Sequence, residues 1–276
     1  MKDITVIIPV HRIEEDFDSL FTEAVSSVRR NIENVKEQFK IKMAVVTTKE
    51  CEPKIKELFT ENEDCCIYIN DTGKTDFCSQ VNFGVSKINT DFFSILEFDD
   101  EYTDKWFLNV AKYYYGNEHI SMFLPVNLCH DGEGKNWEYG NTMALTPAFM
   151  TEKEEDNDDI GIINYERLEK CSLFNITGGV INTDHFKSVG CYKPSIEVSF
   201  NYELLLRMTK KGLKGMVIPK EGYIHALGRK GSLTDYYKNN LSQNEIDRWF
   251  NVAIRECKHT EERLIDIDSQ NEEEIK

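Results

Sequence analysis

The sequence predicts an α/β fold in which helices flank a mixed, mostly parallel sheet. Within the first hundred residues, short apolar segments alternate four times with amphipathic ones. Such alternation builds parallel strands that are joined by right-handed helical crossovers. The chain has 276 residues, of which 40% are hydrophobic and 11% aromatic. This composition supports a substantial core and excludes global disorder.

Four apolar segments predict the strands of the amino-terminal half. Residues 4–10 form a continuous, β-branched run, which is typical of a strand buried on both faces. Residues 43–47, 66–69 and 92–96 are shorter runs of the same kind. We therefore expect these segments to lie inside the sheet, with helices above and below them.

Helical periodicity fills the intervals between these strands. Apolar residues recur at steps of three and four through residues 17–35, and again through residues 77–88. Pro53 suits the first turn of a helix, and it opens a short helix that runs towards Phe59. Each predicted strand is thus followed by a helix that can cover the sheet.

The second half of the chain is less regular. Helices are predicted at residues 105–115 and 202–211, and a last helix begins at a capping box made by Ser242 and Glu245. Strands are predicted at residues 122–126, 216–219 and 223–227, and regular structure is expected to resume at residues 178–182.

These elements divide the chain into three parts. Residues 1–235 are predicted to form one domain, into which a polar excursion at about residues 129–170 is inserted as a flexible flap. Residues 236–262 form a helical extension. Residues 263–276 are an acidic tail that we expect to be disordered.

The net charge of −16 is unevenly distributed along the chain. Residues 152–159 and 260–276 together account for −10, and both are interpreted as solvated segments. A chain with this negative charge is not expected to bind the nucleic-acid backbone over a broad surface, because such binding requires basic residues. No apolar run approaches the roughly 18 residues of a membrane span, and no signal peptide is apparent. The eight cysteines are therefore expected to be reduced thiols in a cytoplasmic protein.

Acidic residues gather where the fourth predicted strand ends. Glu97, Asp99, Asp100 and Glu101 lie at its carboxyl end, where mutual repulsion and desolvation make several carboxylates costly. A divalent cation offsets both costs, and carboxylate oxygens suit Mg²⁺ or Mn²⁺. Open α/β sheets also bind ligands beyond the carboxyl ends of their strands. These residues predict a metal site, with an ordinary acidic turn as the alternative.

Four sequence blocks follow one another between residues 4 and 233. They are the opening VIIPVHR, then QVNFG with SILEFDD, then TGGVINTDHFKSVGCYKP with YELLLRMTKKG, and finally IP with GRKGSL. In this order the blocks resemble the motifs of family-2 glycosyltransferases. The resemblance implies a GT-A fold, whose Rossmann-like sheet is mixed and mostly parallel. It also implies sugar transfer from a nucleoside diphosphate donor with the help of Mn²⁺ or Mg²⁺.

The resemblance implies roles for individual residues. Asp99 would be the metal ligand of the acidic motif, with Glu97 and His225 as further ligands. Asp100 would orient the sugar or the metal shell. The residues implied in binding the donor are Pro9, Val10, His11, Glu14, Asn82, Glu97, Asp100, Arg229, Lys230 and Ser232.

Two positions depart from the pattern of the family. The second strand of the family ends in aspartates, one of which reads the base, whereas this chain has Thr47-Thr48-Lys49. The nucleotide is therefore left open, with Asp71 as a substitute contact. Asn201 stands at the place of the family's general base, and an amide cannot accept a proton as a carboxylate does. Glu203 and Glu197 are the expected substitutes, although Glu203 could instead be a solvent-facing helical residue.

The resulting hypothesis is an inverting, metal-dependent glycosyltransferase with a glycan or another hydroxyl acceptor. Acceptor contacts are expected in the polar excursion, from Trp137 and Tyr139. The alternative is a GT-A module that has lost its base and binds nucleotide, glycan or protein without turnover. A nucleotidyltransferase is disfavoured because no glycine follows the first strand, and an NAD(P) enzyme because no Gly-x-Gly-x-x-Gly occurs there. An oligomer is left open.

Overall fold

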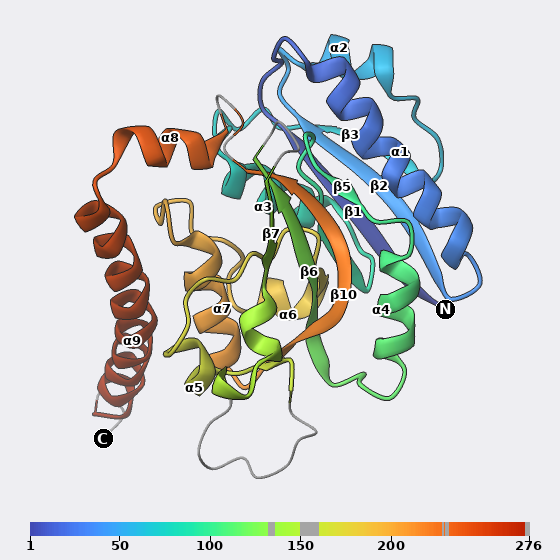
Figure 1. Ribbon diagram of the computed structural model, residues 1–276. Helices are drawn as coiled ribbons and strands as arrows, with labels where there is room; N and C mark the ends of the chain where they lie inside the picture. Colours follow the sequence, from blue (N-terminus) through green and yellow to red (C-terminus); the bar gives the residue numbers. More distant parts are fainter. Residues whose placement is uncertain (132–135, 150–159, 228, 230–231, 274–276) are drawn as a thin grey trace.

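A mixed sheet covered by helices runs through the molecule and confirms the predicted α/β class (Figure 1). The computed structural model describes residues 1–131, 136–149, 160–227, 229 and 232–273. Within these ranges the sheet has ten strands. Their carboxyl ends position the site described below.

Four parallel strands form the amino-terminal half of the sheet, as predicted. They are β1 Lys2–Val10, β2 Phe39–Thr47, β3 Cys65–Ile69 and β4 Phe92–Ile95. β1 lies between β2 and β4, and β3 extends the sheet beyond β2. Val6 and Ile8 belong to one buried cluster, whereas Ile7 belongs to the other. The run is apolar at every position because both faces of the strand are covered.

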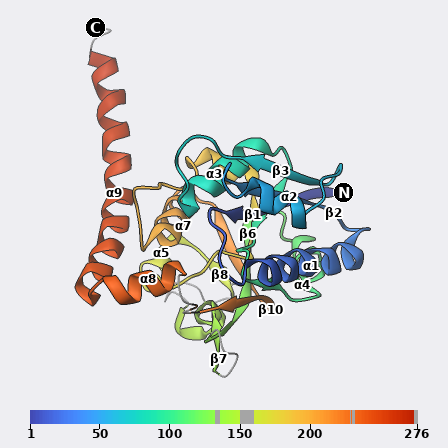
Figure 2. The same ribbon diagram turned by 90° about the horizontal axis from the view of Figure 1, so that it is seen from above.

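Helices cover both faces of this half (Figure 2). They are α1 Phe17–Val35, α2 Glu52–Leu58, α3 Phe77–Lys87 and α4 Trp106–Tyr114. Phe17 of α1 and Trp106 of α4 are buried on one face, and α3 packs on the other. Gly84 allows α3 to approach the sheet, since a Cβ there would lie 2.8 Å from Val46 Cγ2. The helices predicted in this half are therefore confirmed.

The carboxyl-terminal half of the sheet mixes parallel and antiparallel pairs. Its strands are β5 Glu101–Tyr102, β6 Ile120–His130, β7 Trp137–Gly140, β8 Ile162–Ile163, β9 Val180–Asn182 and β10 Lys214–Ala226. β6 and β10 are parallel, and β9 runs antiparallel between β4 and β6. The strand order is β3-β2-β1-β4-β9-β6-β10-β5, with β7 paired to β6 and β8 to β10.

β10 corrects the prediction of two short strands at residues 216–219 and 223–227. It is one strand, whose pairing with β6 shifts register between Val217 and Tyr223. Pro219 lies in this interval, and a proline cannot donate a hydrogen bond to the ladder. The gap between the two predicted strands is therefore an irregular stretch within one continuous strand.

Part of the polar excursion at about residues 129–170 is regular structure. Besides β7 and β8, it contains the 3₁₀ helices η1 Thr142–Leu145 and η2 Pro147–Phe149 and the short helix α5 Tyr165–Leu168. Residues 132–135 and 150–159 of the excursion lie outside the described residues, and the flexibility expected for it stays a prediction. The acidic run at residues 152–159 lies outside them as well.

The remaining helices lie in the last third of the chain. They are α6 Thr183–Ser188, α7 Phe200–Lys210, α8 Leu233–Asn240 and α9 Gln243–Glu273. The predicted capping box is confirmed, since the Ser242 backbone N–H donates to Glu245 Oε2 at 2.8 Å. α9 packs on α7, where Ala253 is buried and the rings of Tyr202 and Phe250 lie 5.7 Å apart.

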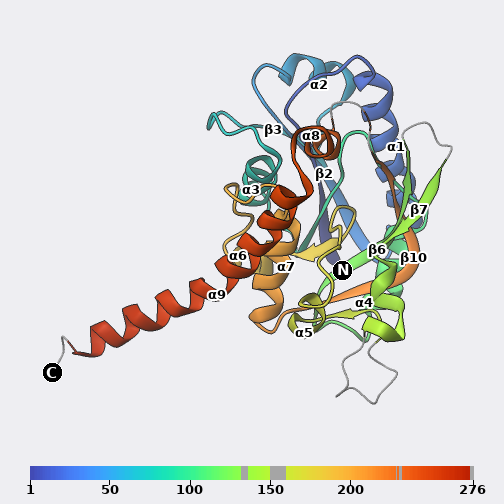
Figure 3. The same cartoon turned by 60° about the vertical axis from the view of Figure 1, so that its left-hand side comes forward.

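α9 continues well beyond this contact and projects from the body of the molecule (Figure 3). It ends at Glu273, and the disorder expected for residues 263–276 stays a prediction. Among the described residues, the chain has no helix that is long and apolar enough to span a bilayer. All eight cysteines are free, in agreement with the expected thiols.

Candidate functional site

A cavity of about 910 Å³ opens at the carboxyl-terminal edge of the sheet. His11 follows β1, Glu97 follows β4 and His225 lies near the end of β10, and all three line the cavity. The start of α7 and most of α8 line its opposite side. Open α/β sheets bind ligands at this edge, because the loops that leave the strands diverge there. The cavity is therefore the candidate site.

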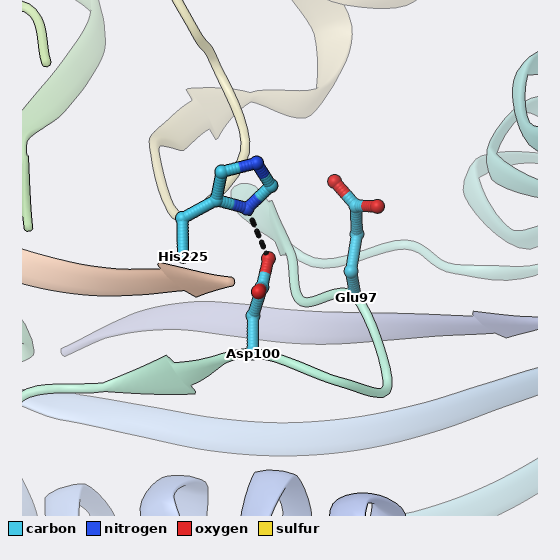
Figure 4. A group of neighbouring side chains, drawn as sticks. All are labelled: Glu97, Asp100 and His225. Atoms are coloured by element: carbon cyan, nitrogen blue, oxygen red, sulfur yellow. Dashed lines mark hydrogen bonds and ion pairs between the residues drawn. The ribbon is translucent and has the colours of Figure 1, made fainter. Parts of the chain in front are cut away.

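Three side chains that could hold a metal ion converge at this edge (Figure 4). One ligand atom from each of Glu97, Asp100 and His225 lies within 4.8 Å of the other two. His225 Nδ1 lies 2.7 Å from Asp100 Oδ2, and the Ala226 backbone N–H donates to Asp100 Oδ1 at 3.0 Å. Asp100 is only 3% exposed. This buried carboxylate therefore fixes the orientation of the imidazole.

The crowding of these groups changes their protonation. Burial and the negative charge of Asp100 raise the pKa of Glu97 to about 8. The same two causes raise the pKa of Asp99. Burial lowers the pKa of His225, but the charge and hydrogen bond of Asp100 outweigh this effect and raise it to about 9. A cation would relieve the repulsion among the carboxylates, so the site is electrostatically suited to one.

The chemistry of the cluster fits a divalent metal ion. Carboxylate oxygens are preferred by Mg²⁺ and Mn²⁺, and an imidazole nitrogen is compatible with Mn²⁺. A histidine that binds a metal commonly has its other ring nitrogen held by a carboxylate, as Asp100 holds His225 here. Glu97, Asp100 and His225 are thus the residues that could hold an ion.

Asp99, the residue first expected to bind the metal, pairs instead with Arg229. Arg229 Nε donates to Asp99 Oδ2 at 2.7 Å, and a second guanidinium nitrogen donates to Glu14. The guanidinium also lies over the ring of Phe98, 5.4 Å from its centroid. Asp99 lines the cavity, whereas the group of side chains that could hold an ion contains Asp100 and not Asp99.

Several other predicted residues do reach the cavity. Those that line it are His11, Glu197, Asn201, Arg229 and Ser232. Asn201 Oδ1 accepts a hydrogen bond from the Tyr192 hydroxyl at 2.8 Å, and Ser232 Oγ caps α8 by accepting from the Asp235 backbone N–H. Glu14 contributes through its ion pair with Arg229. The structure thus brings residues from both ends of the chain to one cavity.

Other predicted donor-binding residues are placed elsewhere. The described cavity lining does not include Pro9, Val10, Asp71, Asn82 or Asp100. Pro9 and Val10 are buried in β1, and Asp71 is exposed after β3. Asn82 holds the backbone of Tyr192, donating to its carbonyl at 2.8 Å and accepting from its N–H at 2.9 Å. Lys230 lies outside the described residues.

Glu203 neither lines the described cavity nor faces solvent. It is fully buried in α7, where its two carboxylate oxygens accept from Arg207 at 2.7 Å each. Lys193 Nζ lies 3.1 Å from the same carboxylate. Arg207 also donates to the carbonyls of Val189 and Cys191, so the pair anchors the segment after α6. This arrangement corrects the expectation of a solvent-facing residue, and the ion pair with Arg207 leaves Glu203 poorly placed to act as a base.

Sequence reasoning missed several residues of the cavity. Arg12 lines it and pairs with Glu14, and Glu138 of β7 and Tyr236 of α8 line it too. Asn127 of β6 is buried in its wall. The signal for Asn127 was present, because it is a polar residue that follows an apolar run. α8 carried no signal, since short polar helices resemble loops.

The aromatic residues expected at the acceptor do not line this cavity in the described structure. Trp137 and Tyr139 lie on β7, where Trp137 packs against His130 with ring centroids 5.0 Å apart. Glu138, between them, lines the cavity. Successive residues of a strand point to opposite faces, so the two aromatic side chains are on the outer face of β7.

The amino-terminal part of the chain matches a known family. The model of glycosyl transferase family 2 matches residues 5–175, which begin in β1 and extend past α5. No curated protein matches the chain in sequence. The match covers β1 to β4 and the acidic cluster, so it includes Glu97 and Asp100, two of the three side chains that converge beside the cavity.

Solved structures with the same fold include those of S. aureus TarS. The structure of TarS 1–349 in complex with UDP-GlcNAc has a TM-score of 0.60 at 12% identity, covering 92% of this chain and 65% of that chain. A second structure of TarS 1–349 has a TM-score of 0.53 at 13% identity, covering 90% of this chain and 69% of that chain. A structure of S. aureus TarS has a TM-score of 0.54 at 12% identity, covering 92% of this chain and 43% of that chain. At these identities the likeness concerns the fold, and it confirms the expected GT-A architecture.

Proposed function

The chain belongs to glycosyl transferase family 2, and on that premise we propose a metal-dependent transfer of sugar from a nucleoside diphosphate to a hydroxyl acceptor, with inversion at the anomeric carbon. The observation that carries the proposal is the convergence of Glu97, Asp100 and His225 beside one cavity, which Glu97 and His225 line and behind which Asp100 is buried. With about 910 Å³, the cavity falls in the usual range for small-molecule sites.

The cluster would bind the diphosphate end of the donor. Glu97, Asp100 and His225 would hold Mn²⁺ or Mg²⁺, which neutralises negative charge on the leaving diphosphate. Asp100 keeps the imidazole of His225 oriented through their hydrogen bond. The guanidinium of Arg229 lies at the same edge and can form paired hydrogen bonds to a phosphate, as it does to carboxylates.

Glu197 is the proposed general base. It is an exposed carboxylate that lines the cavity just before α7. Asn201 is an amide and Glu203 is bound to Arg207, so neither of them is a suitable proton acceptor. Glu197 would take the proton of the acceptor hydroxyl. Attack on the face of the sugar opposite the leaving diphosphate then inverts the anomeric configuration.

A donor screen tests the reaction class. The protein would be incubated with Mn²⁺ and a panel of UDP-, GDP- and dTDP-sugars, including UDP-GlcNAc, the ligand of the TarS structure with a similar fold. We expect one nucleotide class to raise the Tm, its sugar to be released, and both effects to disappear with EDTA. No Tm shift with any nucleotide and metal would contradict the proposal.

Asn201 favours a second candidate, a module that binds a nucleotide sugar without turnover. Glu197→Gln distinguishes the two, with Glu166→Gln as the control because Glu166 is exposed on α5 and does not line the described cavity. For an enzyme, Glu197→Gln lowers kcat by about 10²-fold or more and leaves donor affinity unchanged. Donor binding without release of sugar by the wild type, even with acceptors, would support the module.

A further inference from the structure

Asn127 is a buried amide without a hydrogen-bond partner among the described residues. It is 1% exposed, and neither its Nδ2 nor its Oδ1 is bonded. Buried polar groups are almost always paired, because water would otherwise have bonded them in the unfolded chain. Among the described side chains with unpaired buried atoms, Asn127 alone has both ends of an amide unpaired. An amide in this state is suited to bind a ligand.

Asn127 is next to the metal-binding cluster. In the parallel pairing of β6 and β10, Asn127 is the partner of Tyr223 and Cys129 is the partner of His225. Residues two apart on a strand share a face, and adjacent strands are about 4.8 Å apart. Asn127, Cys129 and His225 all line the cavity. The amide therefore lies one strand away from His225 and slightly before it along the sheet.

Gly140 leaves the amide accessible. It is the partner of Asn127 in the antiparallel pairing of β6 and β7. A Cβ at Gly140 would lie 3.2 Å from Asn127 Cβ and 3.9 Å from its Cγ, so a larger side chain would cover the amide. Both residues line the cavity. The structure thus combines an unpaired amide with open space beside it.

We propose that Asn127 recognises hydroxyl groups of the transferred sugar and is a specificity-determining residue. This inference rests on the proposed function, in which the diphosphate is held at the cluster and the sugar attached to it lies alongside. An amide offers both a donor and an acceptor, which match two neighbouring hydroxyls of a sugar ring. An epimer with one hydroxyl inverted loses a hydrogen bond and leaves part of the buried amide unpaired.

A comparison of two asparagines tests the inference. Asn31 is also 1% exposed, but its Nδ2 donates to the carbonyls of Ser27 and Thr103, and its Oδ1 accepts from the Phe107 N–H. Wild type, Asn127→Ala and Asn31→Ala would be measured for Tm, for the Kd of UDP and of UDP-GlcNAc with Mn²⁺, and for the preference between UDP-GlcNAc and its 4-epimer UDP-GalNAc.

Asn127→Ala is expected to weaken UDP-GlcNAc binding about tenfold or more relative to UDP. The preference between the epimers should fall by a similar factor, and the Tm should not fall, because no hydrogen bond within the protein is lost. Asn31→Ala should lower the Tm and leave the ratio of the two Kd values and the epimer preference unchanged.

Two results would overturn this inference alone. One is an unchanged ratio of the two Kd values together with an unchanged epimer preference in Asn127→Ala. The other is a Tm loss like that of Asn31→Ala with equal weakening of both ligands, which would make Asn127 a structural residue. A wild type that binds neither UDP nor any other nucleotide with metal overturns the proposed function itself, and this inference with it.

Discussion

Arg229 Nε donates to Asp99 Oδ2 at 2.7 Å and thereby joins the loop after β10 to the loop after β4. A second nitrogen of the same guanidinium contacts Glu14, in the loop after β1. Three loops at the edge of the cavity are thus connected by one cation. A diphosphate bound at this edge would compete with two carboxylates for Arg229.

Arg229→Gln is predicted to weaken binding of UDP with Mn²⁺ about tenfold, because a charged bidentate donor to phosphate is lost. The Tm should change little, since the ion pairs of Arg229 are partly exposed and such pairs stabilise weakly. Arg30→Gln is the control, because Arg30 pairs with Glu23, Glu101 and Asp104, none of which lines the described cavity. Calorimetric titration measures both variants. If Arg229→Gln binds UDP as tightly as wild type, the arginine serves only to connect the loops.

Glu203→Gln is predicted to lower the free energy of unfolding by about 3 kcal/mol. The substitution leaves the buried guanidinium of Arg207 without its carboxylate, and loss of one partner of a buried pair is strongly destabilising. Urea denaturation gives this free energy, and exposed Glu166→Gln should lie within about 0.5 kcal/mol of wild type. Nucleotide affinity of the folded protein should not change. A stable Glu203→Gln protein that has lost transfer activity would restore Glu203 as the base.

Cys129 is predicted to be a poor nucleophile although it lines the cavity. Burial, and then the charge of Glu138, raise its pKa to about 11. The raised pKa keeps the thiol protonated at pH 8, and only the thiolate reacts. Iodoacetamide at pH 8 should therefore alkylate the partly exposed Cys66 and Cys171 first, as peptide mass spectrometry would show. Alkylation of Cys129 at a similar rate would contradict this and would make a cysteine nucleophile plausible at the cavity.

Local pattern was sufficient to predict the amino-terminal half of the fold. The apolar run of β1 and the helical stripe of α1 depend on residues close in sequence, and their bounds agree with the structure to within a few residues. β10 was divided because its register shifts are set by pairing with β6, a strand about ninety residues earlier. Its continuity comes from a long-range partner that local pattern does not show.

The candidate site was predicted in outline but not in its pairings. Asp100 contacts His225, 125 residues further along the chain, whereas Asp99 pairs with Arg229, 130 residues further along. Which of the two aspartates joins the cluster therefore depends on these distant partners. The spacing of Glu203 and Arg207 was compatible with a helical ion pair. Its burial, however, depends on the segment after α6 that Arg207 binds. In each case the role of a side chain is decided by a distant segment folded against it.

A titration of Mn²⁺ in the presence of UDP, in wild type and in His225→Ala, tests most directly whether Glu97, Asp100 and His225 hold a metal ion. Removal of His225 leaves the buried carboxylate of Asp100 without its imidazole partner, so the Tm of the free protein is measured as the control and the two affinities are compared at a temperature where both proteins are folded. We expect one Mn²⁺ per wild-type chain, and affinity at least about tenfold lower in His225→Ala. Equal affinity in the two proteins, or no Mn²⁺ bound by the wild type, would contradict the assignment.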